Sequence, residues 1–190
     1  MIKITLGSSS PCRQKLLKDW GFEFEVLNPQ IDEKAIRSDD LRQLPLLVAM
    51  AKSEALKGKI FEPTILITCD TIVIHAGKLY EKPKDEAEAR EFLSSYGAAP
   101  AEVICGVVVT NTQTGQTVSG TDSAKVYFHK IPAKLIDEMV KLGKIMDYAG
   151  AFHPDDPPIK PYIVHIDGER GTVMGLPEFL TRQLIEKVSI

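Results

Sequence analysis

The segment from Gly7 to Arg13 has the residue types of a phosphate-binding loop. Its small residues would let an anion approach the main chain, and Pro11 is typical of the first residue of a helix, where N–H groups lack intrahelical partners. Arg13, in the first turn of that helix, would add a planar guanidinium that suits phosphate oxygens. The same pattern also fits an ordinary helix start with Ser10 as its N-cap, since it is neither a P-loop nor a dinucleotide-binding fingerprint.

A second candidate is Asp70, which follows the apolar run Thr64–Cys69. If that run is a buried strand, Asp70 closes it at the carboxyl end, where α/β folds usually bind their ligands. There the carboxylate could hold a hard metal ion or activate a water molecule. A solvated aspartate in a turn is the alternative. A phosphatase that forms an aspartyl phosphate is disfavoured, because its usual second Asp is replaced by Ile72.

Three further charged residues, Glu33, Lys52 and Lys82, could join the same site. Taken singly, each fits an ordinary surface charge. Only a fold that brings them together with Asp70 would give them a shared role.

Alternating strands and helices are expected to position these residues. Strands are predicted from alternating or continuous apolar runs, and helices from 3.6-residue periodicity with capping residues. A hairpin in the middle of the chain makes the sheet mixed, so the predicted fold class is α/β with flanking helices. The predicted strands are residues 1–6, 22–26, 64–69, 72–74, 78–80, 102–110, 117–128 and 162–166, and the predicted helices are residues 11–20, 46–56, 85–96, 132–143 and 178–187.

Length, charge and cysteine content narrow the class of protein. The chain has 190 residues and no linker-like segment, which predicts a single domain over residues 1–190. With 23 Lys and Arg against 26 Asp and Glu, the net charge of −3 predicts no nucleic-acid or membrane partner. No apolar run approaches the roughly 20 residues of a membrane-spanning helix. The three cysteines form no Cys-x-x-Cys pair, which favours a reducing, cytoplasmic location.

Several segments, taken together and in order, resemble the Maf family of nucleoside triphosphate pyrophosphatases. The resemblance covers nearly the whole chain. The matching segments are Ser8-Ser9-Ser10-Pro11-Cys12-Arg13, Asp32-Glu33, Ala51-Lys52, Asp70-Thr71-Ile72-Val73, Glu81-Lys82-Pro83-Lys84-Asp85, Ala149-Gly150-Ala151-Phe152 and Val173-Met174-Gly175-Leu176-Pro177.

The resemblance implies a fold and an activity. The implied fold is a long, curved mixed sheet between two lobes, with nucleotide in a cleft, similar to inosine triphosphate pyrophosphatases. The implied reaction is hydrolysis between the α- and β-phosphates of a nucleoside triphosphate, giving the monophosphate and pyrophosphate, with Mg²⁺ or Mn²⁺ as cofactor. A homodimer is a further expectation of the family.

The resemblance also implies a role for each candidate. Arg13, Lys52 and Lys82 would neutralise the triphosphate, and Asp70 would orient or deprotonate the attacking water. The implied catalytic residues are Asp70, Lys82 and Lys52, the implied substrate-binding residues are Ser8, Ser10, Cys12 and Arg13, and the implied metal ligands are Glu33 and Asp70.

Three departures from the family pattern leave the substrate open. Cys12 replaces the first Arg of the motif, Tyr148 replaces a common Lys, and Asp155 lies in a stretch that usually carries a Gln for base recognition. One branch of the family prefers dTTP and UTP and another N7-methylguanosine, cytidine and uridine triphosphates, and this chain matches neither cleanly. A nucleotide-sensing regulator of cell division without catalysis is the alternative function, although Asp70, Lys52 and Lys82 favour an enzyme.

Overall fold

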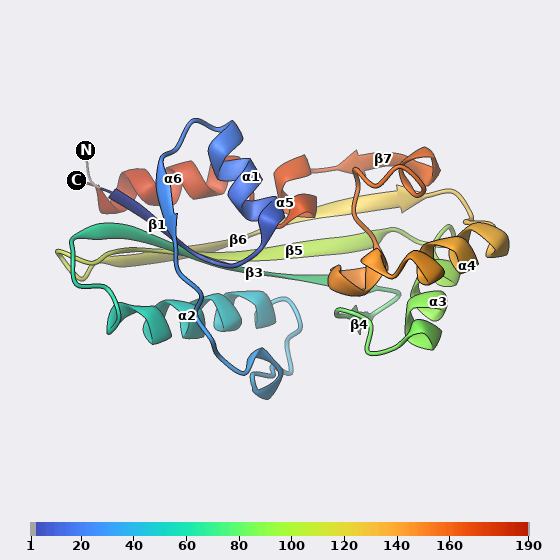
Figure 1. Ribbon diagram of the computed structural model, residues 1–190, viewed down its shortest axis with the longest axis horizontal. Coiled ribbons are helices and arrows are strands. Elements are labelled where there is room, and N and C mark those ends of the chain that lie inside the picture. Colours follow the sequence, from blue (N-terminus) through green and yellow to red (C-terminus); the bar gives the residue numbers. More distant parts are fainter. Residues whose placement is uncertain (1–2, 190) are drawn as a thin grey trace. The chain divides into compact units, whose positions relative to one another are not determined.

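A seven-stranded mixed sheet runs through the computed structural model, which describes residues 3–189 (Figure 1). The strands are β1 (Lys3–Gly7), β2 (Phe24–Val26), β3 (Thr64–His75), β4 (Lys78–Tyr80), β5 (Ala101–Asn111), β6 (Thr117–Phe128) and β7 (Ile163–Asp167). The helices are α1 (Pro11–Asp19), α2 (Leu44–Lys57), α3 (Glu86–Ser95), α4 (Ala133–Leu142), α5 (Arg170–Met174) and α6 (Glu178–Val188), with short 3₁₀ turns between them.

The strand order is β2-β1-β3-β5-β6-β7, and β4 pairs with β3. Strand β1 runs parallel to both β2 and β3, whereas β4 is antiparallel to β3 and β7 is antiparallel to β6. The predicted α/β fold with a mixed sheet and flanking helices is therefore confirmed.

Most predicted elements agree with the structure to within about two residues at each end, and Met1 and Ile2 lie outside the described residues. The exception is β3. The two predicted strands on either side of Asp70 are one strand of 12 residues, so the prediction that Asp70 closes a strand is wrong. The β-branched residues that follow, from Thr71 to Ile74, keep the backbone extended past the single polar position. Helix α5 was missed because five residues are too few to show a helical period.

The chain forms two compact units, each with a hydrophobic core of its own. The first unit takes in the described residues up to Asp70, Cys105–Asp122 and those from Met174 on, and the second takes in Thr71–Ile104 and Ser123–Val173. Strands β3, β5 and β6 each contribute residues to both units. A single domain over residues 1–190 stays a prediction.

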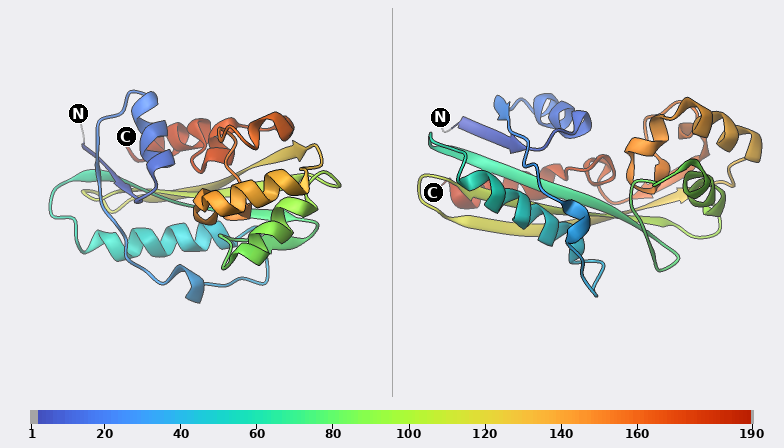
Figure 2. Two further views of the ribbon diagram at one scale, coloured as in Figure 1. Left: turned by 45° about the vertical axis from the view of Figure 1, so that its right-hand side comes forward. Right: turned by 60° about the horizontal axis from the view of Figure 1, so that its bottom comes forward.

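In the first unit, α2 covers one face of the strands, and α1 and α6 cover the other (Figures 1 and 2). Successive residues of a strand point to opposite faces. Along β3, Ile67 and Cys69 accordingly join the core that includes α1 and α6, while the Thr68 hydroxyl donates to the Ala49 carbonyl of α2 at 2.8 Å. Asp70, two residues after Thr68, therefore lies on the α2 face.

Gly106 marks a close approach of α2 to β5. A Cβ at this position would lie 2.4 Å from the backbone N and 2.5 Å from the Cα of Leu46. We expect Gly106→Ala to lower the free energy of unfolding by about 1–3 kcal/mol, because neither backbone can rotate away. Gly58→Ala, at the end of α2, is the matched control, since nothing lies within 4 Å of its added Cβ. Equal stabilities of the two variants in urea denaturation would contradict this packing.

The second unit is built around aromatic side chains under α3 and α4. Helix α3 begins as its sequence predicts, because Asp85 Oδ1 accepts a hydrogen bond from the Glu88 N–H at 2.8 Å. The turn from β3 to β4 has positive φ at Ala76 and Gly77, as a two-residue hairpin turn of the primed type requires.

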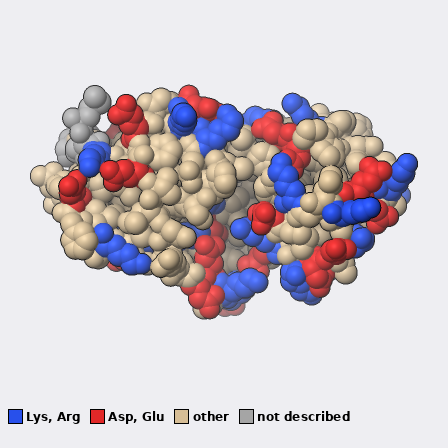
Figure 3. Space-filling model, viewed as in Figure 1, with Lys and Arg blue, Asp and Glu red and all other residues tan. Residues whose placement is uncertain are grey.

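The outer surface carries both signs of charge. On the face shown in Figure 3, basic and acidic side chains are interspersed. Within residues 3–189, the helices are all too short or too polar to cross a bilayer.

Candidate active site

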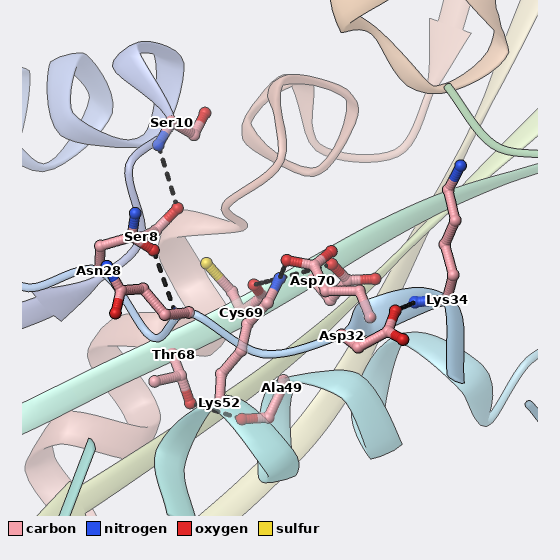
Figure 4. A network of polar contacts seen from close by, with 12 residues as sticks. Ser8, Ser10, Asn28, Asp32, Lys34, Ala49, Lys52, Thr68, Cys69 and Asp70 are labelled. Atoms are coloured by element: carbon pink, nitrogen blue, oxygen red, sulfur yellow. Dashed lines mark hydrogen bonds and ion pairs between the residues drawn. The ribbon is translucent and has the colours of Figure 1, made fainter. Parts of the chain in front are cut away.

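Lys52 lies between two carboxylates in the first unit (Figure 4). Its Nζ is 2.8 Å from Asp70 Oδ1 and 3.0 Å from Glu33 Oε1. The same ammonium group donates to the Cys69 carbonyl at 3.4 Å. The structure thus brings together three of the predicted site residues.

The register between α2 and β3 explains this meeting. The Thr68 hydroxyl donates to the Ala49 carbonyl, which fixes one point of contact between the two elements. Lys52 follows Ala49 by three residues on the same helix face, and Asp70 follows Thr68 by two residues on the same strand face. The contact between Thr68 and Ala49 therefore places Lys52 next to Asp70.

Glu33 reaches the site from a 3₁₀ turn, Glu33–Ala35. Asp32 caps this turn, since its Oδ1 accepts from the Lys34 N–H at 3.1 Å (Figure 4). The Glu33 side chain is 52% exposed, so this carboxylate remains accessible to solvent while it pairs with Lys52.

Burial separates Lys52 and Asp70 from ordinary surface charges. Their side chains are 5% and 13% exposed, so the surface-charge interpretation of Lys52 and the solvated-turn interpretation of Asp70 are both wrong. Burial raises the pKa of the Asp70 carboxyl, and the charges of Lys52 and Arg13 oppose that rise without cancelling it. The neighbouring Lys52 and Arg13 thus offset part of the cost of burying the Asp70 carboxylate.

The loop before α1 holds a buried guanidinium. Arg13 is 9% exposed, and its Nε donates to the Gly175 carbonyl at 2.9 Å. Its Nη1 donates to Ser8 Oγ at 3.2 Å, and the same oxygen accepts from the Ser10 N–H at 3.2 Å (Figure 4). Ser10 occupies the N-cap position of α1 but makes no side-chain cap hydrogen bond. Ser8, rather than Ser10, thus organises this loop.

Other predicted residues lie at the edge of this arrangement or outside it. Cys12 is half-buried in the first turn of α1, next to Arg13, and forms no disulfide within residues 3–189. In the second unit, Lys82 is exposed between β4 and α3, Asp155 pairs with Arg170, and Tyr148 lies near His153, with 5.1 Å between ring centroids. Their parts in the site stay predictions.

Sequence reasoning missed the acceptor of Arg13. Gly175 lies in the segment Val173-Met174-Gly175-Leu176-Pro177, which matches the family pattern, and it follows Arg13 by 162 positions. A backbone carbonyl gives no residue-type signal, so only the fold reveals this contact.

The donor set fits a metal ion that is shared with a phosphate-bearing ligand. Glu33 and Asp70 offer carboxylate oxygens, and Mg²⁺ is usually bound through one or two carboxylates together with substrate phosphates. Between residues 3 and 189, no group of three or more His, Cys, Asp and Glu side chains could hold a metal ion by itself.

Comparisons with known proteins agree with the resemblance. The family model for Maf-like proteins matches residues 3–188. A 7-methyl-GTP pyrophosphatase of Dictyostelium discoideum is 40% identical, over 98% of this chain and 97% of that protein. A dTTP/UTP pyrophosphatase of Alkaliphilus metalliredigens is 31% identical, over 93% of this chain and 91% of that protein.

This chain also aligns with the solved structure of a HAM1 protein from Coxiella burnetii. The alignment covers 98% of this chain and 100% of the HAM1 chain. The sequence identity is 14% and the TM-score 0.49, so this likeness supports no conclusion about the site or its chemistry.

Proposed function

The chain belongs to the family of Maf-like proteins, and we propose that it hydrolyses nucleoside triphosphates to nucleoside monophosphates and pyrophosphate. One observation carries this proposal, namely the buried ammonium of Lys52 between the carboxylates of Asp70 and Glu33. The names of the two relatives, both pyrophosphatases of nucleoside triphosphates, support the same reaction.

Binding of the triphosphate requires positive charge. Arg13 and Lys52 would supply two such charges in the first unit, and Lys82 would supply a third. Glu33 and Asp70 would hold Mg²⁺ or Mn²⁺ together with phosphate oxygens. When bound, the metal would offset the charge of the phosphates and so let two carboxylates lie close to them.

The chemical step is an attack of water on the α-phosphorus. Asp70 would orient this water and accept its proton. A bond forms between the water oxygen and the α-phosphorus, and the bond from that phosphorus to the oxygen bridging to the β-phosphate breaks. Pyrophosphate leaves with its negative charge matched by the cationic side chains.

Catalysis and nucleotide sensing are separated by one experiment. The purified chain is incubated with natural, N7-methylated and deaminated nucleoside triphosphates, with Mg²⁺, Mn²⁺ or EDTA, and pyrophosphate release is measured. We expect release with at least one substrate and a divalent metal, and none in EDTA. Tight nucleotide binding by calorimetry without pyrophosphate release would favour the sensor instead.

The preferred base and the setting of the protein are narrower proposals. The relatives named above act on 7-methyl-GTP and on dTTP or UTP, so both classes belong in the substrate panel. We further propose a homodimer in the cytoplasm, without a nucleic-acid or membrane partner. The odd number and wide spacing of the three cysteines, which form no Cys-x-x-Cys pair, favour a reducing compartment.

A further inference from the structure

The backbone at Gly150 and Ala151, in the second unit, has a left-handed conformation. Their φ values are +68° and +59°, which an alanine adopts rarely because its Cβ is crowded there. A Cβ at Gly150 would lie 2.7 Å from the Tyr96 hydroxyl and 3.2 Å from the Val73 methyl groups. The surroundings therefore hold this segment in one unusual conformation.

The segment is connected directly to the backbone of Lys82. The Gly150 N–H donates to the Glu81 carbonyl at 3.1 Å, and Glu81 precedes Lys82. The next residue, Pro83, is buried and restricts Lys82 to extended geometry. The exposed Lys82 side chain thus projects from a backbone that is fixed on both sides.

Tyr96 holds the other side of Gly150. Its hydroxyl donates to the Gly150 carbonyl at 2.7 Å. The ring stacks on Phe128, with 4.6 Å between centroids, and makes edge contacts with Phe152 and His75. Burial raises the pKa of Tyr96 well above its ordinary value, so the hydroxyl keeps its proton and stays a donor. A buried tyrosine hydroxyl needs such a partner, and here the partner is the strained segment.

We propose that Tyr96 is a positioning residue for Lys82 and acts on it through Gly150 and Glu81. The inference rests on the proposed function, in which Lys82 meets the triphosphate. Without the Tyr96 hydroxyl, the Gly150 carbonyl loses its partner and the segment can turn toward other conformations. The hydrogen bond from Gly150 to Glu81 then weakens, and the Lys82 backbone loses one of its two constraints.

Tyr96→Phe tests this role because it removes one oxygen and keeps the ring. We expect kcat/KM for pyrophosphate release to fall about ten- to hundredfold, the effect of a small misplacement of a charged group in an active site. Tyr80→Phe is the matched control. Tyr80 lies in the same core and stacks on Phe92, and its hydroxyl donates to Ser95 Oγ at 3.4 Å. The kcat/KM of Tyr80→Phe for pyrophosphate release should stay within about twofold of the wild-type value.

A double-mutant cycle shows whether Tyr96 acts through Lys82. In a Lys82→Ala background, Tyr96→Phe should cause no further loss of kcat/KM. Losses that multiply would overturn the inference, because they would mean that Tyr96 acts on general stability. Full activity of Tyr96→Phe beside a weakened Lys82→Ala would also overturn it, while leaving the proposed function intact.

A measurement that does not depend on activity distinguishes the positioning role of Tyr96 from the proposed function. Amide hydrogen exchange of Gly150, followed by NMR, should be faster in Tyr96→Phe than in Tyr80→Phe, since only the first variant loosens the bond to Glu81. Unchanged exchange would overturn the connection itself. Full activity of Lys82→Ala would overturn the proposed catalytic role of Lys82, and the inference with it.

Discussion

Asp70→Asn is expected to lower the rate of pyrophosphate release by about 10²–10⁴-fold, the usual loss when a general base is removed. Asparagine has nearly the same shape but neither the charge nor the basicity of the carboxylate. Folding should persist, because Lys52 keeps its ion pair with Glu33 at 3.0 Å. Nucleotide binding should persist as well, since Arg13 is anchored independently by Gly175.

Two measurements on one preparation check this result. Steady-state pyrophosphate release gives the rate, and calorimetry gives nucleotide affinity. Asp32→Asn is the matched control, because Asp32 lies next to the site but caps a turn instead of contacting Lys52. Near-wild-type turnover of Asp70→Asn would refute the mechanism, and joint loss of folding and binding would make Asp70 a structural residue.

Lys52→Met is expected to lower the free energy of unfolding by about 3–5 kcal/mol, as breaking a buried ion pair does, and to abolish most hydrolysis. Methionine keeps much of the length of the side chain but leaves Asp70, 13% exposed, facing Glu33 without a cation between them. Equilibrium urea denaturation of the metal-free chain measures the loss.

Two further variants separate this charge effect from a packing effect. The double variant Lys52→Met/Asp70→Asn should recover part of the lost stability, because it leaves no buried carboxylate without a cationic partner. Lys57→Met, on the same helix, removes an exposed ion pair with Glu54 and should change stability by less than about 1 kcal/mol. If Lys52→Met and Lys57→Met had the same free energy of unfolding, the ion pairs of Lys52 would not contribute to stability.

The sequence predicted the elements of this fold well, because their patterns are local. Apolar alternation, Pro11 at a helix start and the Asp85 cap each act within a few residues. The error at Asp70 arose from treating one polar residue as a strand end. Its charge is accommodated inside β3 by Lys52, which comes from a helix and is not visible in the strand itself.

The candidate site was predictable only as a set of residue types. Asp70, Lys52 and Glu33 could be named from the sequence, and their meeting needed the register of α2 on β3. Contacts made by backbone carbonyls, such as Gly175 with Arg13, carry no residue-type signal and could not be foreseen. The part of Lys82 stays a prediction.

The contact between Arg13 and Gly175 also bears on how the protein is made. Translation produces Arg13 early, whereas its acceptor follows 162 positions later, and α6 completes the same core later still. The second unit ends at Val173, so all its residues have been synthesised before the last segment of the first unit, which starts at Met174. A polypeptide interrupted before Gly175 would contain every predicted catalytic residue and yet lack the carbonyl that anchors Arg13. In unfinished chains, the Arg13 side chain would therefore lack the backbone contact that fixes it beside Ser8 in the finished protein.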